Sequence, residues 1–429
     1  MESQIQYNIG DVVTDAYLIG MIADVKRVQG SRAVYDISVG GTIIAGIITH
    51  KGVAYFGSCD KNFYAVDIAT GKELWRFSTK DIIIVRCRIY NDRIYFSSYD
   101  RNCYCLSLDG RLIWKFTAKG KLTTMPCIKN DRIYFGSFDK HLYCLTTDGK
   151  LVWDMKMNDA ISSNISVHRG IVYFGSFDNN FYAVKADGSG ITWKFSCNGD
   201  VGAPEVYINK LYFGSFDQNF YCLDLKGNLV WKFTANGPVP IMEPLVKNGI
   251  AYALSWDKHM YALDSETGKL LWKFETNDMC ATIAREDNGI VYFGSADGNL
   301  YALDKKTGKR VWNFQTKGPI VSPVGIWKDI VLFGGWDCNL YCLDNKGNLI
   351  WRFPTALSYV STIDMSEPEF KLVSEVIIPE DDKKEKKQVE ETINPGYIAM
   401  ETQYGDFDIT YTGQELSKNP FEKKKRVYR

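Results

Sequence analysis

The sequence predicts an all-β fold, an eight-bladed β-propeller of four-stranded blades, followed by a C-terminal extension. Three observations predict it: a repeat of about 40 residues, four extended segments in each repeat, and an aromatic content of 14%. A unit of this length with four strands is typical of a propeller blade. The 26 Tyr, 23 Phe and 11 Trp residues fit β-sheets, which favour aromatic side chains.

The repeat is clearest in the hexapeptide Tyr-Phe-Gly-Ser-Phe-Asp, which stands at Tyr134–Asp139. Near copies and weaker copies of it end at eight turn aspartates: Asp60, Asp100, Asp139, Asp178, Asp217, Asp257, Asp297 and Asp337. A tryptophan follows each aspartate: Trp75, Trp114, Trp153, Trp193, Trp231, Trp272, Trp312 and Trp351. These tryptophans are 38 to 41 residues apart, so the chain contains eight equivalent units.

The third unit illustrates the four strands expected in each blade. β-Branched and aromatic residues fill its extended runs, while Asn, Asp and Gly fill the gaps between them. The expected strands are Leu122–Ile128, Ile133–Phe138, Leu142–Leu145 and Leu151–Met155. Eight such sheets can close radially, which leaves only short edges exposed.

A second motif connects the repeat to a family. Residues Ala65–Trp75 match the pattern Ala-x-Asp-x-x-x-Gly-Lys-x-x-Trp, as do Ala262–Trp272 and Ala302–Trp312, while the other five units keep the Trp and alter the turn. This pattern is the docking motif of PQQ-type propeller repeats. The chain therefore resembles the quinoprotein-alcohol-dehydrogenase-like propellers, which include cofactor-free members of the BamB type. The resemblance covers about residues 32–353 and is far more specific for fold than for function.

The docking motif also has a physical reason of its own. Gly accepts the positive φ angle of the hairpin turn, and Thr or Asp can bond the turn backbone. The flat Trp of the outer strand can pack against the neighbouring blade, where its indole N–H needs an acceptor. We therefore expect a structural docking role for all eight tryptophans.

The N-terminal residues are expected to take part in ring closure. Residues Ala33–Gly41 align with an outer strand, with Tyr35 in the Trp position, so residues 32–39 are expected at the seam near the eighth blade. That blade already has Leu349–Phe353 as an outer strand, so which strand closes the ring stays open. The expected propeller spans residues 32–365, and residues 1–31 form an N-terminal extension in which 16–24 could pair with 32–39 as a hairpin.

The C-terminal part changes character after about residue 366. The mixed-charge run Glu380–Lys387 has no apolar residue, so residues 366–396 are expected to form a charged, disordered linker. Residues 397–429 are expected to form a β-hairpin, from Tyr397–Tyr404 and Phe407–Tyr411, and a basic tail. The tail is either a solvated end or a contact to an acidic partner or nucleic acid.

Composition restricts the function classes. The 51 Lys+Arg residues balance 51 Asp+Glu, which excludes a globally basic nucleic-acid binder and a strongly acidic chain. The polar start Met1–Gln6 lacks a secretory signal, and no apolar run approaches the roughly 18 residues of a membrane span. An odd count of eleven Cys indicates reduced thiols. We therefore expect a cytoplasmic protein without a membrane span.

The repeated Asp-x-Asn element invites a metal interpretation, because eight carboxylates would form a ring. Asp, however, begins Asx-type turns and Asn tolerates the left-handed conformation, so hairpin construction is the preferred interpretation. All four His occupy repeat-equivalent positions, and no Ser/His/Asp triad, phosphate loop or zinc pattern occurs. We therefore expect no catalytic residue and no resident metal.

The resemblance implies one place where a cofactor could lie. Quinoprotein dehydrogenases hold the quinone and a calcium ion on the central axis, and many cap it with a disulfide between adjacent Cys. This sequence has no adjacent Cys pair, so no cofactor is expected. Inner strands do carry Glu205 and Glu243, with Asn164 one blade earlier, which leaves a carboxylate-lined axial cation site as an alternative.

The residue before each turn aspartate departs from the small residue expected in this family. It is aromatic in six of eight units, and we call these six the aromatic crescent: Tyr99, Phe138, Phe177, Phe216, Trp256 and Trp336. Two interpretations remain open. The side chains either pack between blades, or they form an apolar face that binds a partner.

These observations favour a non-enzymatic scaffold that mediates protein–protein interactions within a complex. Its protein partners and its oligomeric state are not specified by the sequence, and nucleic acid is expected only at the basic C-terminal end. The alternative is an axial-site, quinoprotein-like oxidoreductase or small-ligand sensor. A third possibility is that the C-terminal segment makes the main partner contact.

Overall fold

The structure, a computed structural model, describes residues 36–38, 41–240, 242–280, 282–355, 359–364, 370–376, 389–393, 398–400 and 407–409. The chain divides into one unit of Gly40–Leu357 and a second unit of Met1–Val39 with Ser358–Arg429. The first unit contains eight four-stranded antiparallel sheets, each made of four consecutive strands. The prediction of an eight-bladed propeller with four-stranded blades is therefore confirmed.

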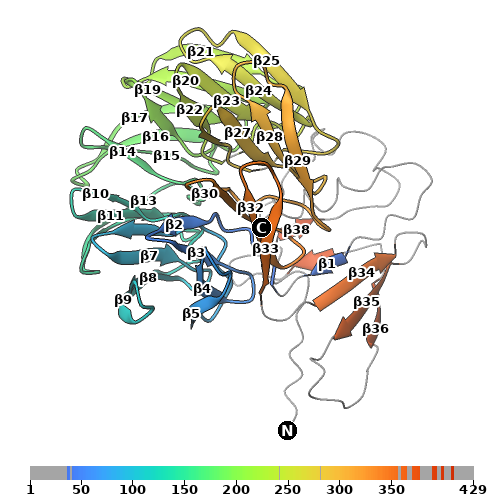
Figure 1. Cartoon of the computed structure of the whole chain (residues 1–429). Coiled ribbons are helices and arrows are strands. Elements are labelled where there is room, and N and C mark those ends of the chain that lie inside the picture. Colours follow the sequence, from blue (N-terminus) through green and yellow to red (C-terminus); the bar gives the residue numbers. More distant parts are fainter. Residues whose placement is uncertain are drawn as a thin grey trace. The chain divides into compact units, whose positions relative to one another are not determined.

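The blades follow one another around the ring in sequence order, from blue to orange (Figure 1). Blade one contains β2 (Ile48–His50), β3 (Val53–Gly57), β4 (Asn62–Asp67) and β5 (Glu73–Ser78). Blade two contains β6 (Arg88–Tyr90), β7 (Arg93–Ser97), β8 (Asn102–Ser107) and β9 (Leu112–Thr117). Blade three contains β10 (Cys127–Lys129), β11 (Arg132–Gly136), β12 (His141–Thr146) and β13 (Leu151–Lys156). Blade four contains β14 (Ser166–His168), β15 (Ile171–Gly175), β16 (Asn180–Lys185) and β17 (Ile191–Ser196).

The second half of the ring repeats this order. Blade five contains β18 (Glu205–Tyr207), β19 (Lys210–Gly214), β20 (Asn219–Asp224) and β21 (Leu229–Thr234). Blade six contains β22 (Leu245–Lys247), β23 (Ile250–Leu254), β24 (His259–Asp264) and β25 (Leu270–Glu275). Blade seven contains β26 (Arg285–Asp287), β27 (Ile290–Gly294), β28 (Asn299–Asp304) and β29 (Arg310–Gln315). Blade eight contains β30 (Gly325–Trp327), β31 (Ile330–Gly334), β32 (Asn339–Asp344) and β33 (Leu349–Pro354).

The hydrophobic core lies between the faces of neighbouring blades. The two middle strands of a blade, such as β3 and β4, are buried on both faces, whereas the outer strand β5 alternates between half-buried and exposed residues. Aromatic rings from adjacent blades stack across this space. The ring centroids of Phe63 and Phe96 lie 4.4 Å apart, and those of Phe181 and Phe213 lie 4.3 Å apart. The aromatic excess of the composition therefore serves packing between blades.

The innermost strand is shorter than the sequence suggested. In blade three it begins at Cys127 instead of Leu122. Pro126 has no N–H to donate, and a side chain takes over part of the main-chain hydrogen bonding to β11. The Thr124 hydroxyl donates to the Gly136 carbonyl at 3.1 Å and accepts the Gly136 N–H at 2.9 Å. The adjoining strand β11 ends at Gly136, so Phe138 belongs to the following turn.

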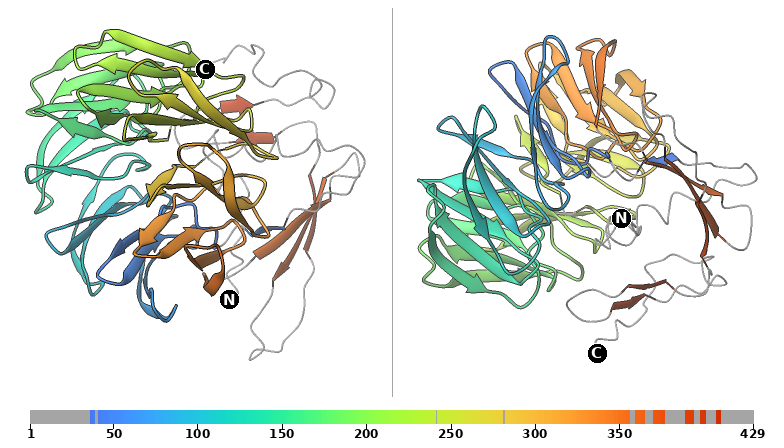
Figure 2. Two further views of the ribbon diagram at one scale, coloured as in Figure 1. Left: turned by 45° about the horizontal axis from the view of Figure 1, so that its top comes forward. Right: turned by 90° about the horizontal axis from the view of Figure 1, so that it is seen from below.

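The ring seam needs no strand from the N-terminus. Blade one lies beside blade eight (Figure 2), and Ile43 N–H donates to the Gly335 carbonyl at 3.2 Å. The expectation that residues 32–39 enter the seam is wrong for Asp36–Ser38, which pair with another strand of the second unit. The physical reason is that β33 already occupies the outer position of blade eight, so no position is vacant.

The second unit contains a sheet in the order β1-β34-β35-β36 and a separate pair, β37 and β38. The bounds are β1 (Asp36–Ser38), β34 (Tyr359–Asp364), β35 (Phe370–Val376), β36 (Val389–Ile393), β37 (Ile398–Met400) and β38 (Phe407–Ile409). Strands β35 and β36 fall within residues 366–396, where we expected a structureless linker. The runs Phe370–Val376 and Val389–Ile393 carry enough apolar and β-branched residues to pair, unlike the charged run Glu380–Lys387, which lies outside the described residues.

Candidate functional site

One face of the ring is built where two kinds of loop meet. The turn between the second and third strands of a blade contacts the loop that leaves the outer strand of the preceding blade. The main-chain N–H of Lys80 in blade one donates to Asp100 Oδ2 in blade two at 3.0 Å, and Lys119 repeats this bond to Asp139 at 3.0 Å. We call this face, formed by residues 58–61 and 79–82 and their equivalents in the other blades, the turn rim.

Each turn aspartate accepts hydrogen bonds from groups of the propeller itself. Asp100 Oδ1 accepts the Asn102 N–H at 3.0 Å, and Asp100 Oδ2 accepts the Tyr104 hydroxyl at 2.7 Å. The same Tyr-to-Asp bond occurs in every blade: from Tyr64 to Asp60, Tyr104 to Asp100, Tyr143 to Asp139, Tyr182 to Asp178, Tyr221 to Asp217, Tyr261 to Asp257, Tyr301 to Asp297 and Tyr341 to Asp337. The predicted Asx-type turn is confirmed in blades one to seven, where Oδ1 of the aspartate accepts the N–H two residues on. No group of three or more His, Cys, Asp or Glu in the described residues could hold a metal ion.

The aromatic crescent lies on the turn rim but is not uniformly exposed. Tyr99, beneath the Lys121 ammonium group, is 3% exposed and Trp336 is 7% exposed, so these two belong to the interior. The four members of blades three to six are half-buried, and we call them the rim aromatics: Phe138, Phe177, Phe216 and Trp256. Packing between blades thus accounts for the two end members of the aromatic crescent. The four central members are accessible enough to contact a partner.

The rim aromatics contact one another in pairs. The rings of Phe138 and Phe177 lie 5.9 Å apart in an edge-to-face arrangement, and those of Phe216 and Trp256 lie 5.2 Å apart. Each pair spans two blades, so the apolar surface continues from one blade to the next.

The eight docking tryptophans lie at the outer strands. Each indole N–H donates to a carbonyl of the next blade at 2.9–3.2 Å: Trp75 to Leu108, Trp114 to Thr147, Trp153 to Ala186, Trp193 to Leu225, Trp231 to Ser265, Trp272 to Lys305, Trp312 to Asn345 and Trp351 to Ile68. The last bond joins blade eight to blade one, so the seam uses the same contact as every other blade boundary.

The ring axis is crossed by an ion pair. Arg86 Nη2 donates to Glu243 Oε2 at 2.6 Å, and the two side chains are 6% and 18% exposed. Arg86 precedes β6 in blade two and Glu243 precedes β22 in blade six, which are opposite blades of an eight-membered ring. Burial lowers the pKa of Arg86, while the Glu243 carboxylate opposes that effect.

Of the other proposed axial residues, Glu205 lies near Glu243, whereas Asn164 is bonded to blade three. Burial and the neighbouring Glu243 carboxylate raise the pKa of Glu205 to about 8, against the opposing effect of Arg88 and Arg86. Asn164 Oδ1 accepts the Met125 N–H at 2.9 Å and thereby ties blade four to blade three. Glu205 and Glu243 also differ in register, because Glu205 is the first residue of β18 whereas Glu243 lies two residues before β22.

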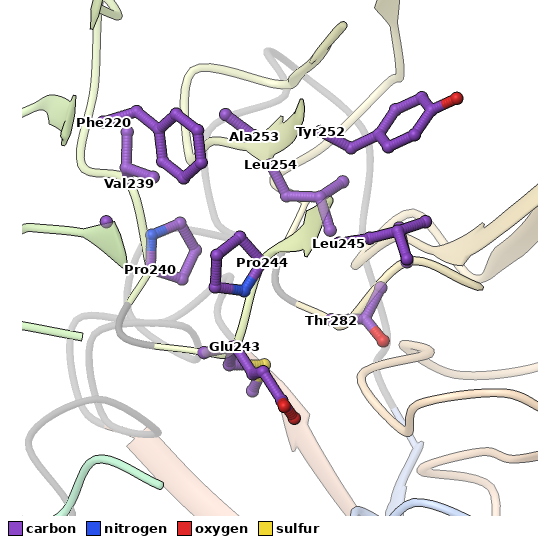
Figure 3. A pocket seen from close by; sticks show the side chains of 13 residues that line it. Phe220, Val239, Pro240, Glu243, Pro244, Leu245, Tyr252, Ala253, Leu254 and Thr282 are labelled. Carbon is purple, nitrogen blue, oxygen red and sulfur yellow. The ribbon is translucent and has the colours of Figure 1, made fainter. Parts of the chain in front are cut away.

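A small cavity of about 20 Å³ lies between blades five, six and seven. It is lined largely by apolar side chains such as Phe220, Val239 and Leu254, and Figure 3 shows the Glu243 carboxylate pointing away from them. A volume of this size holds about one water molecule. The cavity therefore offers no room for an organic substrate.

Most of the cysteine side chains are buried. All eleven cysteines are free, and nine of them are buried. Burial raises the pKa of Cys87 and Cys222 to about 12 and that of Cys144 to about 11. These thiols are protonated near neutral pH, so they cannot act as thiolate nucleophiles.

Comparison with protein families identifies the relationship of the chain. A family model described as "Beta-alanine-activating enzyme, beta-propeller" matches residues 130–369, which are 240 of the 429 residues. The chain belongs to this family. A model described as "Outer membrane protein assembly factor BamB" matches residues 59–148, which confirms the resemblance to PQQ-type repeats. No curated protein sequence matches the chain.

Solved structures share the fold of this member of the beta-alanine-activating-enzyme propeller family. BamB from Moraxella catarrhalis is 17% identical with a TM-score of 0.56, over 67% of this chain and 92% of that chain. Sqt1 from Saccharomyces cerevisiae is 12% identical with a TM-score of 0.62, over 75% and 98% of the two chains. Quinohemoprotein alcohol dehydrogenase from Comamonas testosteroni is 12% identical with a TM-score of 0.61, over 77% and 78%. At these identities the likeness concerns the fold alone.

The axis of this family member does not fit a quinone with calcium. Arg86 runs across the axis against Gly46 of blade one, where an added Cβ would lie 2.2 Å from the Arg86 side chain. The Glu243 carboxylate binds Arg86 and Asn164 binds Met125, so neither oxygen donor is directed to a cation. The predicted alternative of a cation site at Glu205, Glu243 and Asn164 therefore lacks a convergent ligand set.

Sequence reasoning missed Arg86, although the repeat contains a signal for it. Two residues before the innermost strand, other blades carry uncharged residues such as Gly46, Met125 and Ala203. Only Arg86 and Glu243 are charged at this repeat position, with opposite signs and four blades apart. An alignment of the eight repeats at this position would have singled out these two residues as a candidate ion pair.

Proposed function

We propose that this propeller is a non-enzymatic scaffold that binds protein partners through the rim aromatics. The observation that carries the proposal is the presence of four half-buried aromatic side chains at the same rim position of four consecutive blades, in contact as two pairs. Aromatic anchors on a rigid frame are the usual energetic centres of protein interfaces. The name of the fold relative BamB, an outer membrane protein assembly factor, describes a role in assembly and is consistent with such a scaffold.

The alternative is an axial quinoprotein-like oxidoreductase or ligand sensor, and the residues on the axis argue against it. The Arg86–Glu243 ion pair occupies the position that such a ligand would need. The quinohemoprotein alcohol dehydrogenase shares the fold at 12% identity, which does not transfer its activity.

We also propose a reducing compartment such as the cytoplasm. Eleven free cysteines in one propeller fit an environment that keeps thiols reduced. Within the described residues, no helix has the length and apolar character needed to cross a membrane.

The scaffold function is tested with the full chain as bait. Phe138→Ser, Phe177→Ser and Phe216→Ser are combined in one variant, and the co-purifying proteins are quantified by mass spectrometry. The matched control is Val152→Ser with Leu271→Ser, which removes exposed apolar side chains from the outer strands β13 and β25. We expect the rim variant to lose its partners by about tenfold or more while the control keeps them.

Both variants must keep the far-ultraviolet circular dichroism and the unfolding midpoint of the parent within a few degrees. A folded rim variant that retains every partner would refute the proposal. The third possibility, a main contact through the C-terminal segment, predicts instead that removal of residues 366–429 abolishes capture while the rim variant does not.

A further inference from the structure

Polar residues of the turn rim are segregated by charge. Basic side chains occupy the turns of blades one to three and the outer-strand exits of blades one and two, and we call them the basic arc: Lys61, Lys80, Arg101, Lys119 and Lys140. Four of the five are exposed, and Lys61 is half-buried. The equivalent positions in blades four and five carry amides, namely Asn179, Asn198, Gln218 and Asn236, whereas the turn of blade six carries Lys258. The rim therefore has a cationic part and a neutral polar part.

The turn aspartates beside the basic arc accept hydrogen bonds from the fold. Asp100 and Asp139 accept bonds from tyrosine hydroxyls and main-chain N–H groups. Among the described residues, Lys80 and Arg101 take part in no ion pair, whereas Lys140 at the end of the arc pairs with Asp159 at 3.3 Å. The exposed charged residues of this part of the rim are therefore all basic, whereas Asp81 and Asp159 in the same loops are half-buried.

The basic arc and the rim aromatics form one continuous surface. They meet in blade three, where Phe138 stands two residues before Lys140 on the same turn. Phe138 then contacts Phe177 of blade four, which carries the apolar surface onward. A ligand that follows the rim thus meets positive charge first and aromatic rings next.

We propose that the occupant of this surface is an acidic segment of a protein partner that also carries apolar side chains. Its carboxylates lie along the basic arc, and its apolar residues contact Phe138, Phe177, Phe216 and Trp256. Exposed amides such as Asn198 and Asn236 are suited to bond the peptide backbone. This assignment rests on the scaffold function proposed above and specifies its partner class through charge complementarity.

A single-stranded nucleic acid fits this surface less well. Bases need free ring faces for stacking, whereas Phe138 and Phe177 are arranged edge to face. The rim between blades four and five also carries Asp200, whose carboxylate repels a phosphate backbone.

The proposed partner class is tested by selecting binders from random peptides. A twelve-residue peptide library displayed on phage is panned against the full chain, and the selected peptides are synthesised and measured by fluorescence anisotropy. We expect enrichment of peptides that combine Asp or Glu with Leu, Phe or Trp, and weaker binding at high salt. Enrichment of Lys- and Arg-rich peptides, or no enrichment above the display background, would overturn the assignment.

Two charge-reversed variants make the test specific. Lys80→Glu, Arg101→Glu and Lys119→Glu should weaken the selected peptides by about tenfold or more. The control Lys129→Glu, Arg169→Glu and Lys328→Glu, at the innermost strands and their turns, introduces the same charge elsewhere and should leave binding unchanged. Tighter binding of a labelled twenty-nucleotide oligothymidine than of the selected peptides would assign the surface to nucleic acid instead.

The outcomes separate this inference from the scaffold function. Loss of partners in the aromatic variant without an effect of charge reversal would keep the scaffold and reject the acidic partner class. Retention of all partners in both variants would reject both proposals.

Discussion

The guanidinium of Arg86 and the carboxylate of Glu243 meet at 2.6 Å although 157 residues separate them in the chain. Every tryptophan bond joins neighbouring blades, whereas this ion pair joins blades two and six across the ring. The pair links opposite blades, and it makes the axis part of the structural frame. Its energetic role can be measured directly.

Replacing Arg86→Met should destabilise the fold by about 3 kcal/mol, because the partly buried Glu243 carboxylate loses its partner. Equilibrium unfolding in guanidinium chloride measures the loss. The double variant Arg86→Met with Glu243→Met should recover most of the stability, since apolar residues of similar volume replace a buried ion pair at little cost. Single variants that each change the free energy of unfolding by less than about 0.5 kcal/mol would contradict a structural role.

Glu205 should make the propeller less stable as the pH rises. Its pKa is about 8 in the folded state against an ordinary value of 4.5, so the folded protein retains a proton that the unfolded chain releases. The contribution to stability is complete below about pH 4.5 and is lost progressively as the pH rises through 8.

The variant Glu205→Gln removes this titration, so it should be more stable than the parent at pH 9 and nearly equal to it at pH 4.5. Urea unfolding midpoints between these limits provide the measurement. Glu286→Gln is a control for which the stability should depend on pH in the opposite direction. Although burial opposes the effect, hydrogen bonds from Lys247 and Lys305 lower the pKa of Glu286 below its usual range. The stabilisation by Glu286 is present at neutral pH and is lost on acidification. A Glu205→Gln variant with the parent's pH profile would contradict the predicted titration.

Gly149 and Gly170 provide a matched test of tryptophan docking. Both have positive φ angles, +81° and +75°, but a Cβ at Gly149 would lie 2.6 Å from the Trp114 ring, while one at Gly170 would meet nothing within 4 Å. Both alanine variants incur the cost of the left-handed conformation, roughly 1 kcal/mol. Gly149→Ala should cost about 1 kcal/mol more because the indole must move. Equal thermal unfolding midpoints for the two variants would show that the Trp114 ring can move away from residue 149 without loss of stability.

Ile208 is a site where a substitution should stabilise the protein. It is 64% exposed and has a φ of +43°, a conformation that strongly disfavours β-branched residues. The equivalent turn positions carry residues such as Asn91, Asn130 and Asn248. Ile208→Asn should therefore raise the free energy of unfolding by about 1 kcal/mol.

The reverse change, Asn130→Ile in blade three, should lower the stability by a similar amount and serves as the counterpart. Chemical denaturation of both variants measures the pair. Destabilisation by Ile208→Asn would mean that the Ile208 side chain makes contacts that outweigh the backbone strain.

The repetitive sequence was sufficient to predict the blades and the turns. Asp139 and His141 occupy predicted turn positions, and the His141 N–H does donate to Asp139 Oδ1 at 2.9 Å. These features depend on residues close together in the chain, where turn chemistry operates. The start of the inner strand at Cys127 was mispredicted because the Thr124 hydroxyl substitutes for the main-chain ladder, which strand propensity does not reveal.

The sequence by itself thus determined the eight-bladed ring, since each unit repeats the same alternation and turn residues. Only the tertiary structure decided which aromatic residues reach the surface and what occupies the axis. Tyr99 and Phe138 have the same repeat position, yet Tyr99 is buried beneath Lys121 and Phe138 is half-exposed. The repeat specifies where a residue stands within its blade, whereas burial and the Arg86–Glu243 bond depend on side chains from other blades that close packing brings together.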